Sequence, residues 1–214
     1  MTTSPSDTGR VREHFRREAF SFDHLYDEER ALQRLLRSGL FNRRELALAV
    51  ARDYDTPSVL DVGGGSGRIG ELILEQGASR YVDVDLSDTM LDLARDRLER
   101  FDDKVELVQG DFLETPLEGP FDVVLALGYF DYIEDAAAHA GRMGKLCAGS
   151  AVGSFPRWNW VKGPVRKLRY EVINNCPIYD YTEPGLRKLF TDAGFSAVEV
   201  HQPSRGGYLV RADK

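Results

Sequence analysis

Apolar and polar positions follow two different rhythms along most of this chain. From residue 58 onward, short apolar runs typical of β-strands are separated by longer stretches whose apolar residues recur every three or four positions, as in helices. Strands are predicted at 58–62, 80–85, 104–109, 121–126, 150–155, 196–202 and 207–212. This alternation predicts an α/β fold in which helices cover both faces of a mostly parallel sheet.

The last two predicted strands are joined by the short run Pro203-Ser204-Arg205-Gly206-Gly207. Parallel neighbours need a crossover connection of a dozen or more residues, and this run is too short to hold one. We therefore expect these two strands to pair antiparallel as a hairpin near the edge of the sheet.

The spacing of apolar residues predicts helices at 11–19, 27–38, 42–52, 68–76, 88–100 and 182–193. Gly39 is expected to end the second helix, and Ser87 to cap the fifth. The first three helices precede the first strand, so we expect a helical extension at 10–56 that closes over a ligand as a lid. Residues 1–9 are rich in Ser, Thr, Pro and Gly, which favours a disordered tail, and 57–214 is expected to form one domain.

Composition narrows the class of partner. With 28 basic and 35 acidic residues the formal net charge is −7, so the chain lacks the positive field that nucleic-acid phosphates attract and no DNA partner is expected. Cys147 and Cys176 are isolated, which predicts neither a disulfide framework nor a metal site. No apolar stretch approaches the length of a membrane span, so we expect no membrane insertion and a cytoplasmic location.

A glycine-dense turn between a predicted strand and a predicted helix is the strongest chemical signal. Glycine has no side chain and can take positive φ, so this turn can bring backbone N–H groups against a ligand. Gly65, Gly67 and Gly70 fit the G-x-G-x-x-G of dinucleotide folds. The spacing Asp61-x-Gly63-x-Gly65-x-Gly67 instead ends the strand with an acid that would face the ligand, repel a pyrophosphate and suit a cation such as S-adenosylmethionine (SAM).

The next two strands also end in acids. Asp85, followed by Leu86, is placed to accept the two ribose hydroxyls, and Asp83 is the alternative. After the third strand, Asp111 could accept the adenine amino group and Phe112 could cover the ring. Three consecutive strand ends therefore each offer a carboxylate to one ligand.

In this order, the motifs resemble those of class I SAM-dependent methyltransferases over roughly 57–214. The resemblance implies a Rossmann-like, seven-stranded, mostly parallel sheet with one antiparallel strand, SAM as cofactor and S-adenosylhomocysteine (SAH) as product. It implies cofactor contacts from Asp61, Gly63, Gly65, Gly67, Asp85, Leu86, Asp111, Phe112 and Leu127.

The exit of the fourth strand, Leu127-Gly128-Tyr129-Phe130-Asp131-Tyr132, stands where the family's methyl donor meets its acceptor. It lacks the Asn/Asp-Pro-Pro-aromatic motif of enzymes that methylate DNA bases or a glutamine amide, which disfavours that branch. Acid–base candidates are Asp131, Tyr132 and His139. Asp131 could instead cap the following helix, and His139, expected about two turns inside that helix, could be structural.

Substrate contacts are expected from an aromatic and basic insertion at about 156–181 and from an aromatic-Asp-x-x-Tyr element near the N-terminus. Phe22 stands where that element commonly has Tyr. These aromatics could equally fill the core. The candidates are Phe22, Tyr26, Tyr129, Arg157, Trp158, Trp160, Tyr179 and Tyr181.

The favoured function is methyl transfer from SAM to O, N or C of a small, aromatic or conjugated metabolite. One alternative is a methyltransferase acting on a protein or RNA. A second alternative is an NAD-type oxidoreductase or a non-catalytic nucleotide-binding protein. The exposed insertion could also mediate a homodimer.

Overall fold

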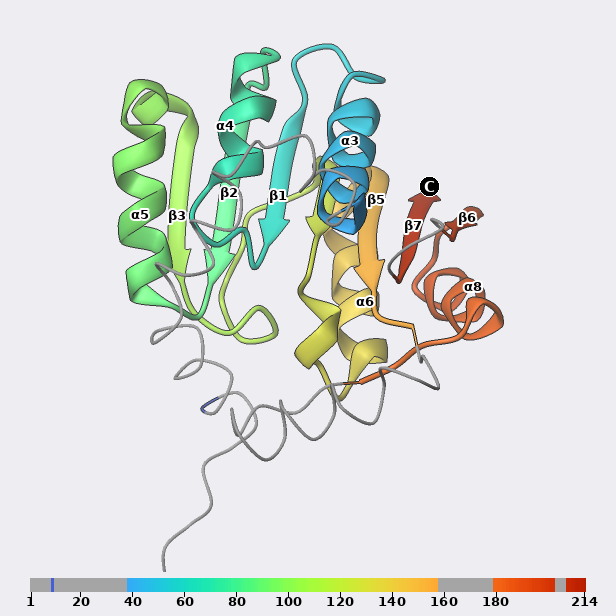
Figure 1. Ribbon diagram of the computed structural model, residues 1–214. Helices are drawn as coiled ribbons and strands as arrows, with labels where there is room; N and C mark the ends of the chain where they lie inside the picture. Colours follow the sequence, from blue (N-terminus) through green and yellow to red (C-terminus); the bar gives the residue numbers. More distant parts are fainter. Residues whose placement is uncertain (1–8, 10–37, 158–178, 203–206) are drawn as a thin grey trace, which may run out of the picture.

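The computed structural model describes residues 9, 38–157, 179–202 and 207–214 (Figure 1). They form a seven-stranded sheet in the order β3-β2-β1-β4-β5-β7-β6. β7 runs antiparallel to both of its neighbours, and the other pairings are parallel. The strands are β1 (Ser58–Val62), β2 (Arg80–Asp85), β3 (Val105–Gln109), β4 (Phe121–Ala126), β5 (Cys147–Phe155), β6 (Ala197–His201) and β7 (Tyr208–Asp213).

The predicted fold class is confirmed, including the antiparallel hairpin of β6 and β7. The predicted bounds of β1, β2 and β4 match the structure, β3 differs by one residue at one end, and β6 and β7 differ by one residue at both ends. β5 differs most, because it begins at Cys147 rather than at residue 150. Its first residues pair with Phe121 across an irregular register, which a local sequence pattern does not show.

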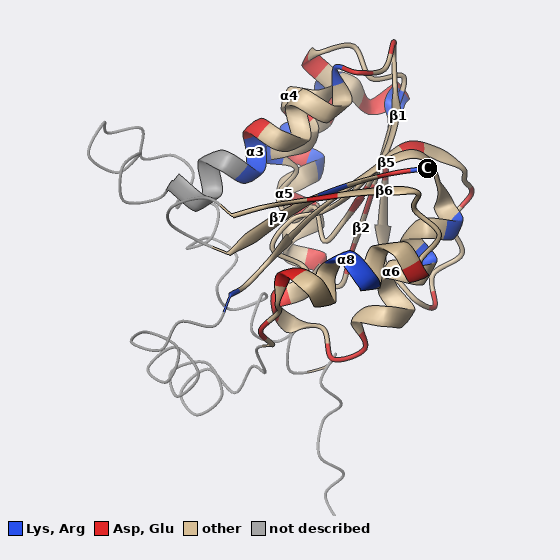
Figure 2. Ribbon diagram, turned by 90° about the vertical axis from the view of Figure 1, so that its right-hand side faces the viewer, with Lys and Arg blue, Asp and Glu red and all other residues tan. Residues whose placement is uncertain are grey.

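Helices cover both faces of the sheet. Figure 2 shows the sheet nearly edge-on, with α3, α4 and α5 on one face and α6 and α8 on the other. The helices are α3 (Ser38–Ala51), α4 (Arg68–Glu75), α5 (Asp88–Leu98), α6 (Ala136–Leu146) and α8 (Glu183–Asp192), with 3₁₀ turns η1 (Glu99–Lys104) and η2 (Phe130–Tyr132). The predicted 88–100 helix is thus split, because Leu98, with φ of −96° and ψ of 4°, leaves α-helical geometry and the chain tightens into η1.

Helix caps confirm some sequence predictions and correct others. The side chain of Ser87 accepts a hydrogen bond from Met90 N, as expected of an N-cap. Asp131 does not cap α6, because Asp135 does so by accepting from Ala138 N. His139 lies in the first turn of α6, not two turns inside it, because the helix starts only at Ala136.

Gly39 was expected to end a helix, and this prediction is wrong. The residue lies near the start of α3, which begins at Ser38, and it does not take the left-handed φ of a C-terminal stop. The expected tail at 1–8 and the expected helices at 11–19 and 27–37 lie outside the described residues.

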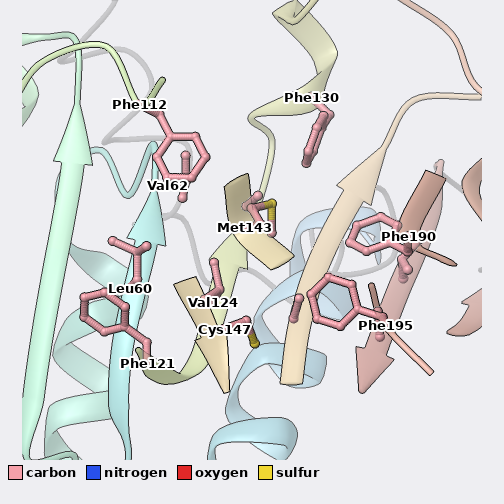
Figure 3. Close-up of a cluster of buried hydrophobic side chains, with 14 of the residues drawn as sticks. Leu60, Val62, Phe112, Phe121, Val124, Phe130, Met143, Cys147, Phe190 and Phe195 are labelled. Atoms are coloured by element: carbon pink, nitrogen blue, oxygen red, sulfur yellow. The ribbon is translucent and has the colours of Figure 1, made fainter. Parts of the chain in front are cut away.

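Two apolar cores separate the sheet from its helices. One lies on the α6 and α8 side, and Figure 3 shows part of it, including Leu60, Phe130 and Phe190. The other lies on the α3, α4 and α5 side and includes Val59 and Tyr81. Because side chains alternate along a strand, Asp61 and Asp83 fall on this second face, where their neighbours are buried apolar groups. In the described part of the chain, no helix is both long and apolar enough to cross a bilayer.

Candidate functional site

The glycine turn joins β1 to α4 at the carboxyl end of the sheet. Gly63, Gly65 and Gly67 all take left-handed conformations, with φ of +71°, +64° and +72°. Residues with a Cβ pay a steric penalty there, so the three glycines of the predicted motif are required by backbone geometry. Gly67 is also the N-cap residue of α4, which leaves the turn open at the positive end of a helix.

Two carboxyl groups of β2 accept hydrogen bonds from backbone N–H groups of this turn. Asp83 Oδ1 accepts from Gly64 N at 3.0 Å, and Asp85 Oδ2 accepts from Gly65 N at 3.1 Å. Asp85 Oδ1 also accepts from Ser87 N at 2.8 Å. Asp83 is fully buried, whereas Asp85 is half-buried at the strand end. Of these two alternatives for the ribose, only Asp85 therefore reaches the surface.

Asp61 lies beneath the turn. It is 2% exposed, and the hydroxyl of Tyr81 donates to its Oδ2 at 2.9 Å. Asp61 was expected to face a ligand directly. The structure corrects its orientation, because strand alternation points the side chain into the core on the α4 side.

The three acids have raised pKa values. Burial raises the pKa of Asp61 and of Asp85 to about 6 each, and backbone N–H groups at Ser87, Gly65 and Leu86 limit the rise at Asp85. Burial also raises the pKa of Asp83 well above its ordinary range, and the charges of Asp85 and Asp61 add to this effect. The clustered carboxyl groups therefore give the site a negative electrostatic potential, which favours the binding of a cation.

The loop after β3 forms the next wall. Asp111 Oδ1 accepts from Leu113 N at 2.8 Å, which shapes the turn, and Phe112 is buried. Arg142 of α6 donates to the carbonyl oxygens of Leu113 and Thr115, and its guanidinium lies over the Phe112 ring, 5.2 Å from the centroid. This arginine fixes the loop from a helix about thirty residues away in sequence, which no local pattern could indicate.

The exit of β4 lies beside the glycine turn because β1 and β4 are neighbours. Gly128 has φ of +77°, and its N–H donates to the buried Ser154 Oγ at 2.7 Å. Arg43 of α3 reaches the same point, since its Nη1 would lie 3.3 Å from a Cβ at Gly128. Sequence reasoning missed both Ser154 and Arg43, because neither belongs to a motif.

Tyr129 and His139 form a pair next to this exit. The Tyr129 hydroxyl lies 2.8 Å from His139 Nδ1, and both rings contact the ring of Phe112. Burial lowers the pKa of His139 and raises that of Tyr129 well above its ordinary value. Both side chains are therefore neutral near pH 7, and a neutral imidazole can accept a proton.

Both ends of the predicted insertion reach the same region. Tyr181 donates its hydroxyl to the carbonyl of Phe130 at 3.1 Å, and Tyr179 N donates to the carbonyl of Asp131 at 3.0 Å. Arg157 forms an isolated bridge with Tyr181. Asp131 is buried and Tyr132 half-buried.

The structure therefore gathers most of the expected site at the carboxyl ends of β1, β2, β3 and β4. The cofactor candidates Leu86 and Leu127 follow β2 and β4 and are half-buried. Phe22, Tyr26, Trp158 and Trp160 lie outside the described residues, so their expected substrate contacts stay predictions.

Comparisons with known proteins agree with this arrangement. A family model described as a methyltransferase domain matches residues 59–146. Ribosomal protein L11 methyltransferase of Pelobacter propionicus is 42% identical over 74 residues, which cover 33% of this chain and 23% of that protein. The match therefore spans about a quarter of the length of this curated relative.

Solved structures are similar over nearly the whole chain. Magnesium protoporphyrin IX methyltransferase of Synechocystis, solved with bound SAH, has a TM-score of 0.78 and 21% identity, covering 98% of this chain and 100% of that chain. A complex between the Haloferax volcanii Trm112 methyltransferase activator and a methyltransferase gives a TM-score of 0.72 and 17% identity, covering 95% of this chain and 96% of that chain. At these identities the similarity concerns the fold.

Proposed function

We propose that the chain transfers a methyl group from SAM to a small acceptor, because residues 59–146 match a methyltransferase domain and the fold is similar to that of a methyltransferase solved with SAH. The observation that carries this proposal is the open, left-handed glycine turn with half-buried acids, Asp85 and Asp111, at the two neighbouring strand ends. The buried carboxyl groups below the turn suit a cation and disfavour the pyrophosphate of NAD.

The residues present fit SAM. Asp85 would hold the ribose, while Asp111 and Phe112 would hold the adenine. The Gly63 to Gly67 turn would carry the amino-acid part, and Arg43 would supply a guanidinium for its carboxylate. When bound, SAM supplies a methyl group for in-line displacement, in which positioning and exclusion of water provide most of the rate.

Tyr129 and His139 are the proposed acid–base pair. An acceptor hydroxyl or protonated amine must lose a proton, and the neutral His139 can take the Tyr129 proton at Nδ1 while Tyr129 takes that of the acceptor. Asp131 and Tyr132 stay as further catalytic candidates. The contacts of Asp131 and Phe130 carbonyls with Tyr179 and Tyr181 support a substrate role for the insertion ends.

A protein or RNA acceptor is the second candidate. It is favoured by the similarity to a ribosomal protein methyltransferase and to a complex containing a methyltransferase activator. The net charge of −7 disfavours RNA. The aromatic composition of the insertion, whose end at Tyr179 and Tyr181 contacts the β4 exit, suits a flat small molecule. We retain the small acceptor, and the cytoplasmic location favoured by the isolated cysteines, as the proposal.

Titration calorimetry with SAM, SAH and NAD tests the cofactor. We expect SAM and SAH to bind and NAD not to bind. If NAD binds and SAM does not, the assignment of SAM as cofactor is wrong and the oxidoreductase alternative is favoured.

Labelled methyl incorporation tests the acceptor. Cell extract incubated with methyl-labelled SAM and the protein, then separated by size, should carry the label in the small-molecule fraction. Tyr129→Phe and His139→Gln should each lower that incorporation, with SAM affinity unchanged in the same preparations. Label in protein or RNA would favour the second candidate.

A further inference from the structure

A column of acidic and phenolic groups runs up one face of β1 and β2 toward the glycine turn. Asp61 pairs in register with Asp83, and Val59 pairs with Tyr81. Tyr81, Asp83 and Asp85 are two residues apart on one strand, so they lie on the same face. The mechanism proposed above uses Asp85 for the ribose and leaves the role of Asp83 unexplained.

Asp83 has an oxygen without a partner. Its Oδ1 accepts from Gly64 N, but Oδ2 is buried and makes no hydrogen bond. A Cβ at Gly64 would lie 2.7 Å from the carboxyl carbon and from both oxygens of Asp83. The carboxyl group therefore lies directly against the backbone of the turn at Gly64.

No cation balances this carboxyl group within the described residues. The groups facing it are Asp61, Asp85 and the Tyr81 hydroxyl, which donates to Asp61. On α5, Arg97 donates to the carbonyl of Ser66 in the turn and lies 3.9 Å from Glu71 of α4. That arginine is thus already shared between a carbonyl and another acid.

A buried carboxylate without a counter-ion is costly, so such a group binds a proton instead. The unpartnered Oδ2 of Asp83 is the atom free to carry that proton, because the oxygens of Asp85 both accept backbone hydrogen bonds and Asp61 accepts from Tyr81. The raised pKa of Asp83 agrees with this assignment.

Resting on the proposed SAM function, we propose that Asp83 is a proton-coupled counter-ion that makes the site prefer SAM to SAH. Asp83 is protonated in the empty protein. When SAM binds with its amino-acid part on the turn, its sulfonium cation enters the site beside the turn. The proton then leaves Oδ2 for solvent, and the resulting carboxylate stabilises the cation. SAH lacks the methyl group and with it the positive charge of the sulfonium. Its binding therefore releases fewer protons than the binding of SAM, and its affinity is lower than that of SAM.

The direct test counts protons. Titration calorimetry of SAM and of SAH at pH 7, each in phosphate and in Tris, gives the number of protons released from the dependence of the heat on the buffer. We expect SAM to release on the order of half a proton more than SAH. Asp83→Asn should abolish the difference, while Glu106→Gln, which neutralises an exposed acid on the adjacent strand β3, should leave it unchanged.

A second measurement needs no variant. In the wild-type protein, the ratio of the SAH to the SAM dissociation constant should rise about tenfold between pH 5.5 and pH 8, since each unit of pKa shift corresponds to a tenfold change in relative affinity. Equal proton release for the two ligands, a ratio independent of pH, or an unchanged difference in a folded Asp83→Asn protein would overturn the inference. Failure of SAM to bind at all would instead overturn the proposed function.

Discussion

At the scale of single residues, the glycines of the turn are needed for two different reasons. Gly63 takes a φ of +71°, and a Cβ there would also approach the Tyr129 ring to 3.0 Å. Gly64 does not take a left-handed φ, but a Cβ at this position would collide with the Asp83 carboxyl group. The first glycine serves backbone conformation and the second serves close approach, although both are the same letter in the sequence.

Asp85→Ala should weaken SAM binding by about 1–3 kcal/mol, because charge-assisted hydrogen bonds to the ribose would be lost. The substitution also removes the acceptor for Gly65 N and Ser87 N. Titration calorimetry measures the effect, with Asp96→Ala on the exposed surface of α5 as the control. An affinity equal to that of the wild type would remove Asp85 from the proposed site.

Arg43→Gln should weaken SAM and SAH binding by the same factor, about tenfold, because the amino-acid carboxylate is common to both ligands. This separates Arg43 from Asp83, whose substitution changes the preference between the two. The same calorimetric titrations apply, with the exposed Arg95→Gln as the matched control. Loss of affinity for only one ligand would contradict the proposed carboxylate contact.

At the scale of elements, the close packing of α4 on β2 positions the turn. Gly70 faces the sheet, and a Cβ there would lie 2.3–2.7 Å from two ring atoms and the hydroxyl oxygen of Tyr81. The Tyr81 ring cannot easily move away, because it is fully buried and its hydroxyl donates a hydrogen bond to Asp61. The glycine therefore sets how near the helix lies, as the third glycine of a strand–turn–helix motif commonly does.

Gly70→Ala should destabilise the protein by about 1–3 kcal/mol through overpacking. Gly141→Ala offers the matched control, since Gly141 is also helical, in α6, but a Cβ there would meet nothing within 4 Å. That control should stabilise by about 0.5–1 kcal/mol through helix propensity. Urea denaturation of the two variants compares them, and equal effects would show that α4 can move away from the sheet.

At the scale of the whole molecule, the buried acids oppose folding to serve the site. A carboxyl group whose pKa is higher in the folded than in the unfolded protein favours folding only while it is protonated. Its contribution is present below the unfolded pKa of 3.8 and is lost as pH rises through the folded pKa of about 6 at Asp61. The cofactor-free protein should therefore lose stability over this range.

Asp61→Asn tests this at the level of global unfolding. The variant keeps an acceptor for the Tyr81 hydroxyl but cannot ionise. Relative to the wild type it should gain on the order of 2 kcal/mol more at pH 7.5 than at pH 4.5. Urea denaturation at the two pH values measures the difference, and a gain that does not depend on pH would contradict the raised pKa of Asp61.

The architecture of this protein and the edge of the sheet that carries the candidate cofactor site could be predicted from its residues alone. Strand and helix periodicity is local, so the strands and the left-handed glycines of the turn could be inferred from neighbouring residues alone. Orientation was less accessible. Asp61 and Asp83 point into the core on the α4 side, and His139 lies in the first turn of α6, because these placements depend on where each element begins and which face is covered.

Which distant residues meet at the site depends on how the elements pack against one another. Arg43 of α3 and Ser154 of β5 converge on Gly128, although the two lie more than a hundred residues apart in sequence, and Arg142 fixes the loop that carries Phe112. No periodicity relates such residues, since the parallel sheet brings them together through crossover connections. Local sequence thus fixes which elements form, whereas the packing of those elements fixes which side chains share one ligand and which carboxyl group is left to hold a proton.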